Sequence, residues 1–317
     1  MIRVILDTDL AMGALGSEID DGFALALAVA EPEVAVELVT TVNGNTDVES
    51  ATLLSIELLD RLGRSDVPVV RGAAAPLLHP GAARGAPDQL RAALGHHRAS
   101  PGYAAAEIAR RVLAAPGEIT IVAIGPLTNI AAALNLEPRL AGAVKEIVVM
   151  GGVYLSGAHT RRMPGEFNFW SDPEAASAVL DSGAPVRLVG LDVTLRVRLT
   201  RDDAAAMAAS GRSFGELAGR QTLAWIDHMH AENPGDARSA DSCAMHDPLA
   251  MAVVGRPGLV TWRPAHVEVV TGSGIARGVA VTDLLTFDDP PAPNCQIAVD
   301  VDVEAFRRYF LDRIAAL

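Results

Sequence analysis

The sequence predicts an α/β fold in which an open, mostly parallel central sheet of the Rossmann type is flanked by helices. Three observations lead to this prediction. Short apolar runs rich in β-branched residues alternate with helical patterns over the first two thirds of the chain. These runs are too hydrophobic to leave one face in water, as expected of strands buried on both faces. The last third instead carries additional helices and a β-hairpin.

The predicted strands and helices of the first two thirds alternate along the chain. The strands cover residues 3–6, 36–41, 67–70, 119–124, 146–150 and 186–191. Between them, apolar residues recur at three- and four-residue spacing, which is typical of helices. The predicted helices cover residues 21–30, 48–62, 103–114, 129–136 and 173–182.

The last third is expected to add helices and antiparallel strands. The pattern predicts helices at residues 204–229, 246–254 and 303–316 and a strand at residues 294–301. Residues 266–271 are expected to pair with residues 276–283 across the turn Gly272, Ser273 and Gly274. No Pro/Gly/Ser linker is long enough to separate domains, so a single domain over residues 1–317 is predicted. The segments 76–101 and 156–165 are expected to be active-site lids.

Composition narrows the classes of protein to consider. Lys and Arg number 26 and Asp and Glu number 39 among the 317 residues, which gives a net charge of −13. Such a charge repels phosphate backbones and anionic lipids, so nucleic-acid and membrane-surface binding are not expected. A hydrophobic content of 50% excludes wholesale disorder. Lys145 is the only lysine, so any mechanism that needs a lysine has one candidate.

The cysteines and the amino end indicate a soluble protein. Cys243 and Cys295 suit neither a disulfide framework nor a Cys-rich zinc site. The amino end predicts a strand rather than a signal sequence, because its apolar run stops at Asp7. No stretch of about 18 apolar residues is present to span a membrane. A cytoplasmic location is therefore expected.

Carboxylates gather where the first strand is predicted to end. Asp7 and Asp9 follow that strand, and Asp20 and Asp21 begin the next helix. Open parallel sheets place ligands at the carboxyl ends of their strands. Four carboxylates so close in sequence repel one another unless a cation neutralises them, and oxygen-only ligands favour calcium or magnesium. The alternative is that Asp20 and Asp21 only cap the helix.

Three later motifs follow other strands or open a helix. The sequence GPLTN, residues 125–129, predicts either a turn with a Thr cap or a loop whose carbonyls face a metal. Glu166 and Asn168 stand one residue apart in a loop and suit the recognition of hydroxyl groups. His246 precedes Asp247 at a helix start, where it is a candidate proton donor with an ordinary pKa near neutrality.

Taken together, these motifs resemble the inosine–uridine preferring nucleoside hydrolases. The motifs stand in the family's order as DTD, DD, GN, GPLTN, MGG, EFN followed by DPEA, and HDPLA. The resemblance covers essentially the whole chain, including the hairpin and the closing helix. It implies a nucleoside hydrolase-like fold and calcium-dependent hydrolysis of the N-glycosidic bond of ribonucleosides, by a metal-bound water that an Asp base activates. It also implies a homodimer or homotetramer.

The resemblance also implies roles for individual residues. It implies that calcium is bound by Asp9, Asp21, the backbone carbonyl of Thr128, and Asp247. Asp9 would also be the general base, and His246 would protonate the departing base. Asp7 would support the metal ligands. The expected substrate-binding residues are Asp20, Asn45, Met150, Glu166, Phe167 and Asn168.

Two departures from the family pattern leave recognition of the base open. Family members commonly have three residues between the DTD motif and the DD pair, whereas this chain has ten, residues 10–19. The usual HG-DGLG-like lid has no clear match near residues 95–102. Candidates for the base pocket are the aromatic and imidazole side chains of Trp170, Trp225, His228 and His230, for which a core or surface role is the alternative.

Two other functions fit parts of the sequence. The DTD motif after a hydrophobic strand also resembles haloacid-dehalogenase-type phosphatases, in which the first Asp is a nucleophile. That chemistry normally uses a lysine near the phosphate, but Lys145 precedes a predicted strand, and GPLTN, EFN and HDPLA stay unexplained. A non-catalytic nucleoside- or ribose-binding protein is the second alternative, and it would have no use for Asp9 as a base.

Overall fold

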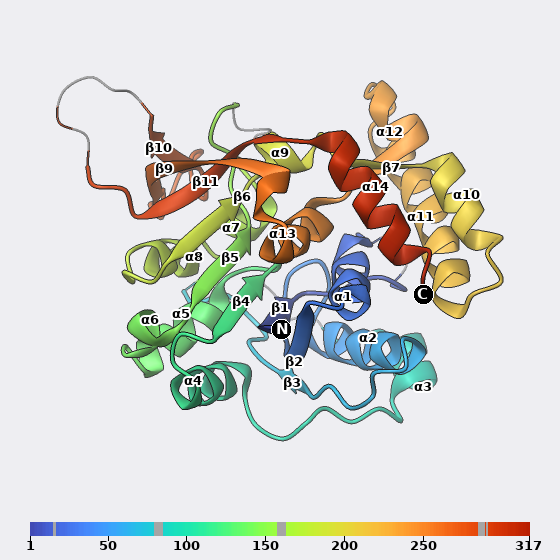
Figure 1. Cartoon of the computed structure of the whole chain (residues 1–317), viewed down its shortest axis with the longest axis horizontal. Coiled ribbons are helices and arrows are strands. Elements are labelled where there is room, and N and C mark those ends of the chain that lie inside the picture. Colours follow the sequence, from blue (N-terminus) through green and yellow to red (C-terminus); the bar gives the residue numbers. More distant parts are fainter. Residues whose placement is uncertain (15–16, 79–84, 157–162, 285–288, 290) are drawn as a thin grey trace.

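The structure is a computed structural model that describes residues 1–14, 17–78, 85–156, 163–284, 289 and 291–317. In this part of the chain, a nine-stranded sheet has the order β10-β9-β11-β6-β5-β4-β1-β2-β3 (Figure 1). Its strands are β1 Ile2–Thr8, β2 Val34–Thr41, β3 Val69–Arg71, β4 Ile119–Ala123, β5 Glu146–Met150, β6 Val186–Val189, β9 Val260–Val269, β10 Ala280–Asp283 and β11 Cys295–Val301. All neighbours from β3 to β11 pair in parallel, and β9 pairs antiparallel with both β11 and β10. The predicted mostly parallel sheet is confirmed.

Helices cover both faces of the sheet and form two hydrophobic layers. One layer packs against α1 Asp20–Ala30, α2 Val48–Arg61, α13 His246–Gly255 and α14 Val303–Ile314. The other packs against α4 Ala104–Ala114, α5 Thr128–Leu136, α6 Leu140–Ala143 and α8 Pro173–Leu180. The central strands β1, β4 and β5 are almost entirely buried, as a sheet covered on both faces requires.

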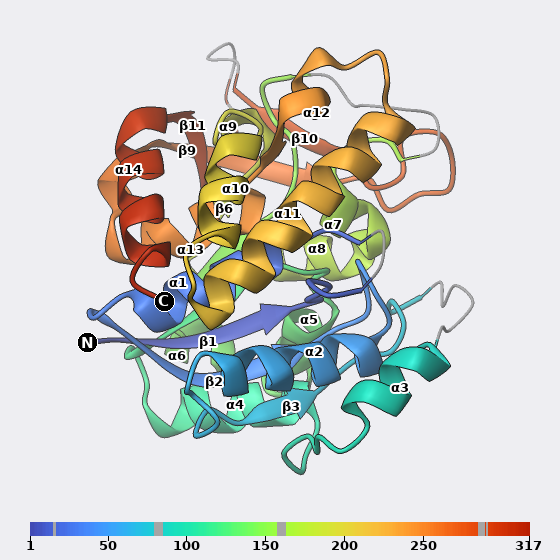
Figure 2. The same cartoon turned by 90° about the vertical axis from the view of Figure 1, so that its right-hand side faces the viewer.

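The remaining elements lie around these two layers. They are α3 Asp88–Leu94, α7 Phe167–Ser171, α9 Leu191–Thr194, β7 Arg198–Thr200, α10 Arg201–Ala208, α11 Ser213–Glu232, α12 Ala237–Asp241, β8 Ser242–Ala244 and the 3₁₀ helix Pro257–Leu259. Strands β7 and β8 pair antiparallel as a separate ribbon. Figure 2 shows α10 and α11 side by side, with α12 beyond the end of α11. Among the described residues, no helix has the length and hydrophobicity that a transmembrane span requires.

Polar caps fix where several helices begin. The Asp47 carboxylate accepts hydrogen bonds from the backbone N–H groups of Glu49 and Ser50 and so begins α2. Asp172 caps α8 in the same way, with Pro173 in its first turn, where no backbone donor is needed. These sequence signals explain why the predicted starts of α2 and α8 agree with the structure.

The predicted helix at residues 204–229 is wrong as one element. The chain forms α10 and α11 instead, and Gly211 between them has φ of 71°, a left-handed conformation that ends a helix. Thr200 and Asp203 form a capping box, so α10 also begins earlier than predicted. Both helices have apolar faces, so the helical spacing of apolar residues alone predicted a single helix.

The β-hairpin of the last third is confirmed, but its second strand is shorter than predicted. Pairing begins at Ala280 rather than at residue 276. Gly278 has φ of 86° and keeps residues 276–279 in the turn. Of the predicted lids, the first contains the helix α3, and residues 79–84 and 157–162 lie outside the described residues.

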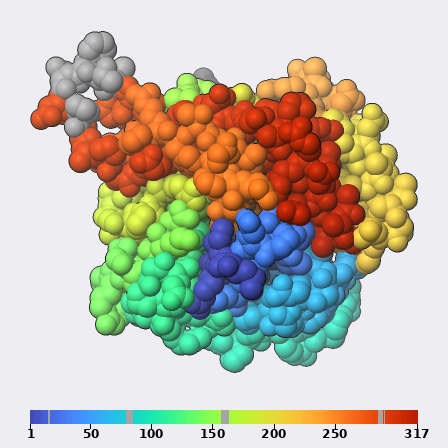
Figure 3. All heavy atoms as spheres, viewed as in Figure 1, coloured from blue at the N-terminus to red at the C-terminus, as the bar shows by residue number. Residues whose placement is uncertain are grey.

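The last third packs against the first helix. Helices α13 and α14 both contact α1, and the surface view shows the orange and red segments directly above the blue amino-terminal one (Figure 3). These contacts support the predicted single domain over residues 1–317, which stays a prediction. Their consequence for the site is that residues from both ends of the chain meet above the same strand ends.

Candidate active site

The candidate site lies where the strand order of the sheet reverses. The chain proceeds from β1 outward to β3 and then returns to β4 on the other side of β1. In such sheets ligands bind outside the carboxyl ends of the strands at this switch point. Asp7 is the last residue but one of β1 and pairs with Thr40 of β2 and Ala123 of β4, and Asp9 directly follows the strand. The predicted acids therefore stand at the switch point.

Three buried carboxylates converge beside this strand end. One oxygen from each of Asp20, Asp21 and Asp247 lies within 4.8 Å of the others. The backbone N–H of Asp247 donates to Asp20 Oδ2 at 3.0 Å, which ties the start of α13 to the start of α1. The hydroxyl of Thr8 donates to Asp21 Oδ1. The cluster is thus assembled from α1 and α13, two helices that pack together.

Asn45 joins Asp9 to this cluster. Its backbone N–H donates to Asp9 Oδ2 at 2.5 Å, and its side-chain amide donates to Asp21 Oδ2 at 3.0 Å. The other oxygen of Asp9, Oδ1, is buried without a hydrogen-bond partner. A buried acceptor with no donor costs free energy, so this atom is suited to a ligand.

Two glycines allow the chain to approach Asp9 closely. A Cβ on Gly44 would collide with the Asp9 carboxylate. A Cβ on Gly125 would lie 2.8 Å from Asp9 Oδ1. The loops after β2 and β4 therefore need glycine where they close around this carboxylate.

The charges of the cluster are not balanced by protein cations. Among the described residues, none of the four acids forms an ion pair with Arg or Lys. Burial, followed by the charge of Asp21, raises the pKa of Asp9 well above its ordinary value and that of Asp20 to about 7. Burial likewise raises the pKa of Asp21 and, with the neighbouring carboxylates, that of Asp247. A hard divalent cation fits this all-oxygen set of donors and would remove the repulsion.

Glu166 and Asn168 form the opposite wall. The buried Glu166 carboxylate caps α7 and accepts from the backbone N–H groups of Asn168, Phe169 and Gly152 at 2.7 to 3.1 Å. The Asn168 amide donates to the carbonyls of Ile124 at 3.0 Å and Met150 at 3.1 Å, so it spans the ends of β4 and β5. Glu166 therefore has a structural role as the cap of α7, and the hydrogen bonds of this cap also hold its carboxylate in one orientation at the site.

A cavity of about 140 Å³ lies between these walls. It is lined by eight residues that the sequence singled out, namely Asp20, Asn45, Met150, Glu166, Phe167, Asn168, His246 and Asp247. Glu18, Ile124, Met163 and Leu191 also line it and were missed. Glu18 precedes the DD pair in the ten-residue loop, and its acidic side chain was the one signal that marked it. Burial raises the pKa of Glu18 well above its ordinary value, and Asp20, Asp21 and Glu166 add to the effect.

Several other candidates lie outside the lining of this cavity. Thr128 is the first residue of α5, and its hydroxyl donates to Asp172 Oδ2 at 2.6 Å. Asp7 accepts from Thr40 and Asn129 on one oxygen, and burial raises its pKa to about 7. The candidates Trp170, Trp225, His228 and His230 do not line the cavity, and the Trp225 and His228 rings stack on each other at 5.3 Å. Base recognition by these four residues stays a prediction.

His246 is held at the edge of the cavity. Its Nδ1 lies 2.7 Å from the Thr194 hydroxyl of α9. Its Nε2 lies 3.9 Å from a carboxylate oxygen of Glu18. The imidazole therefore lies between a buried hydroxyl and an acid of the ten-residue loop.

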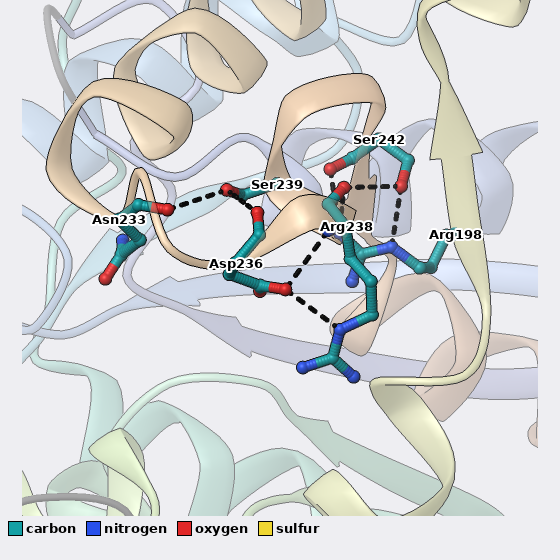
Figure 4. Close-up of polar contacts among 6 residues, drawn as sticks. All are labelled: Arg198, Asn233, Asp236, Arg238, Ser239 and Ser242. Atoms are coloured by element: carbon teal, nitrogen blue, oxygen red, sulfur yellow. Dashed lines mark hydrogen bonds and ion pairs between the residues drawn. The ribbon is translucent and has the colours of Figure 1, made fainter.

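A second polar network holds the strand that leads to His246 and Asp247. In Figure 4, the Arg198 guanidinium donates to the Ser242 hydroxyl and carbonyl and to the Arg238 carbonyl. Ser239 donates to the carbonyls of Asn233 and Asp236, and Asp236 caps α12. We call these six residues the Arg198 network. It fixes β8 against β7, and the next residue, Met245, bonds to the carbonyl of Val197.

Comparison with known proteins decides the family. The model of the inosine-uridine preferring nucleoside hydrolases matches residues 4–308. The chain belongs to this family. It is 36% identical to the non-specific ribonucleoside hydrolase RihC of Klebsiella pneumoniae and 34% identical to that of Escherichia coli, over 99% of this chain and 98% of each relative. The predicted family and enzyme class, a hydrolase acting on N-glycosyl bonds, are confirmed.

Solved structures of nucleoside hydrolases share the fold. The plant nucleoside hydrolase PpNRh1 superposes with a TM-score of 0.88 at 30% identity, over 99% of both chains. The purine-preferring ribonucleoside hydrolase from Gardnerella vaginalis gives a TM-score of 0.85 at 29% identity, over 99% of this chain and 98% of that one. The predicted nucleoside hydrolase-like fold is therefore confirmed.

Proposed function

We propose that this nucleoside hydrolase cleaves the N-glycosidic bond of ribonucleosides to free base and ribose in a calcium-dependent reaction. The observation that carries the proposal is the unbalanced carboxylate cluster at the switch point, beside a cavity lined by Asp20, Asn45, Glu166 and Asn168. The names of the relatives support the substrate class, since they are ribonucleoside hydrolases.

The proposed metal ligands are Asp9, Asp21, Asp247 and the backbone carbonyl of Thr128. When bound, calcium would lower the pKa of the attacking water and fix it next to the ribose hydroxyls. The unpartnered Asp9 Oδ1 and the mutual repulsion of the buried acids support this assignment. Asp20 lies in the same cluster and lines the cavity, as Asp247 also does, and we assign Asp20 to the ribose because the family resemblance implies that role.

Asp9 is proposed as the general base. Its Oδ2 is held by Asn45, so the carboxylate keeps one orientation while Oδ1 accepts the proton of the attacking water. Without metal, burial and the charge of Asp21 raise the pKa of Asp9, and a bound calcium would lower it again and keep the carboxylate ionised to accept a proton. A proton acceptor in a fixed position at the end of β1 is what this step needs.

The walls of the cavity are proposed to bind the sugar. Asp20, Asn45, Glu166 and Asn168 would hold the ribose hydroxyls, and Met150 and Phe167 would contact the apolar faces of the substrate. Cleavage leaves positive charge on the ribosyl ring, and the carboxylates stabilise that charge as paired acids do in glycoside hydrolysis. His246 is proposed to protonate the departing base.

We also propose a homodimer or homotetramer in the cytoplasm, as the family resemblance implies. Light scattering during size-exclusion chromatography measures the oligomeric state, and cell fractionation tests the cytoplasmic location.

The experiment that tests the function is a hydrolysis profile over inosine, adenosine, guanosine, uridine and cytidine, with free ribose measured by a reducing-sugar assay. We expect ribose release that chelation abolishes and calcium restores. Nucleoside binding without release of ribose would instead support the non-catalytic binding protein, and hydrolysis of a phosphate ester would support the phosphatase.

A further inference from the structure

The contact between Thr194 and His246 has no counterpart in the motifs of the sequence. Thr194 is fully buried at the end of α9, and its hydroxyl oxygen lies 2.7 Å from His246 Nδ1. The His246 side chain lines the cavity and is only 15% exposed. One ring nitrogen is therefore engaged by the protein, which turns the other, Nε2, toward Glu18 in the cavity lining.

The structure holds the Thr194 hydroxyl in a fixed place. The backbone N–H of Thr194 donates to the Gly190 carbonyl at 3.1 Å within α9. Asp192 of the same helix accepts from the backbone N–H groups of Tyr154 at 2.6 Å and Leu155 at 2.9 Å. A β-branched side chain has few χ1 rotamers, so a pinned backbone also fixes its hydroxyl.

A hydroxyl partner suits a histidine that transfers a proton from its other nitrogen. In the cationic imidazolium, Nδ1–H donates to the Thr194 oxygen. After Nε2 has given its proton to a leaving base, the neutral ring keeps Nδ1–H and the same hydrogen bond. The ring therefore does not have to turn during the transfer, and the neutral tautomer that remains, with its proton on Nδ1, keeps its hydrogen bond to Thr194.

We infer that Thr194 is the positioning residue of His246, which holds the imidazole with Nε2 toward the departing nucleobase. This inference rests on the proposed role of His246 as the proton donor. Thr194 itself acts through His246, since its hydroxyl engages the ring on the side away from Nε2. Its removal is expected to slow only those substrates whose leaving group needs a proton.

The test compares Thr194→Val, which keeps the shape but removes the hydroxyl, with Thr194→Ser, which keeps the hydroxyl. The rates on inosine and on p-nitrophenyl riboside are measured, because the nitrophenolate leaves without a proton. General-acid help is worth roughly 10²–10⁴-fold. We expect T194V to lower the ratio of the inosine rate to the nitrophenyl rate at least about tenfold, and T194S to restore most of it.

A matched control removes a buried hydroxyl elsewhere. Thr222 is equally buried, and its hydroxyl donates to the Ala218 carbonyl within α11. T222V is expected to leave the substrate ratio within about twofold of the parent. Melting temperatures identify any variant that is poorly folded, and the ratio is insensitive to the folded fraction because both rates scale with it.

The double variant H246A/T194V separates the inference from its premise. If Thr194 acts through His246, T194V adds no further loss of the ratio in the H246A background. An unchanged ratio in T194V, while H246A lowers it, would overturn the inference alone. An unchanged ratio in H246A would overturn the proposed role of His246, and the positioning role with it.

Discussion

The carboxylate cluster and the Arg198 network are both polar, and they differ in how completely their buried polar groups are hydrogen-bonded. In the network, a guanidinium donates to carbonyls and a hydroxyl, and each serine also finds an acceptor. In the cluster, buried acids receive only neutral donors from Thr8, Asn45 and the backbone, and Asp9 Oδ1 receives none. A satisfied network stabilises a fold, whereas unbalanced buried acids cost stability that a ligand can return. The Arg198 network is therefore suited to stabilise the fold, whereas the carboxylate cluster is suited to bind a ligand.

The largest expected effect comes from breaking the cluster at Asp9. Asp9→Asn keeps the volume of the side chain but cannot accept the proton of water, so the rate on inosine should fall by about 100-fold or more. The metal-free melting temperature should stay the same or rise, because one buried acid is removed. Initial rates and calorimetric melting measure the two. A variant with more than a tenth of the parent rate would exclude Asp9 as the base.

Removal of divalent ions should reduce both activity and stability. Chelation leaves the buried acids unneutralised, whereas calcium at about 100 times its Kd stabilises by about 2.7 kcal/mol. We therefore expect the melting temperature to fall by several degrees with chelator and to recover with calcium. Arg198→Met serves as the control, since it lies in the other network and should show the same calcium-dependent rise. Full activity of a preparation shown by elemental analysis to be metal-free would contradict the cluster's role.

The stability of the metal-free protein should depend on pH in an unusual direction. Asp7 and Asp20 have pKa values raised to about 7 by burial, against an ordinary value of 3.8. The folded state therefore binds more protons than the unfolded state between about pH 4 and pH 7, and stability falls as the pH rises through this window. We expect a higher melting temperature at pH 5.5 than at pH 7.5 in chelator. Asp20→Asn should flatten this dependence, and an equally steep profile in that variant would contradict it.

The smallest expected effects separate two arginines of the Arg198 network. Arg198 is half-buried and donates to three oxygens, so Arg198→Met should lower the unfolding free energy by about 1–3 kcal/mol. Arg238 pairs with Asp236 at the surface, so Arg238→Ala should cost less than about 1 kcal/mol. Urea denaturation measures both. Equal losses would show that burial does not decide the strength of this network.

Sequence reasoning found the fold because strand and helix periods are local signals, as in β4 and α5. The sequence pattern predicted one helix across α10 and α11, because both carry apolar faces and Gly211 was not recognised as the break between them. It also predicted where the acids lie, because residues that follow parallel strands meet at the same edge of the sheet. Glu18 and Thr194 were missed because their contacts with His246 join segments far apart in the chain. Two of the Arg198 hydrogen bonds end on backbone carbonyls, which a pattern of side chains does not reveal.

The hydrogen bond from Asp247 to Asp20 spans 227 positions of the chain. At 5–20 residues per second, a ribosome needs roughly 10–45 s to travel that distance. During this interval the newly made Asp9, Asp20 and Asp21 exist without their fourth carboxylate, and α1 exists without α13 to cover it. With the proposed set of metal ligands, we expect a product that terminates before Asp247 to be inactive. The proposal therefore predicts that activity appears only near the end of synthesis.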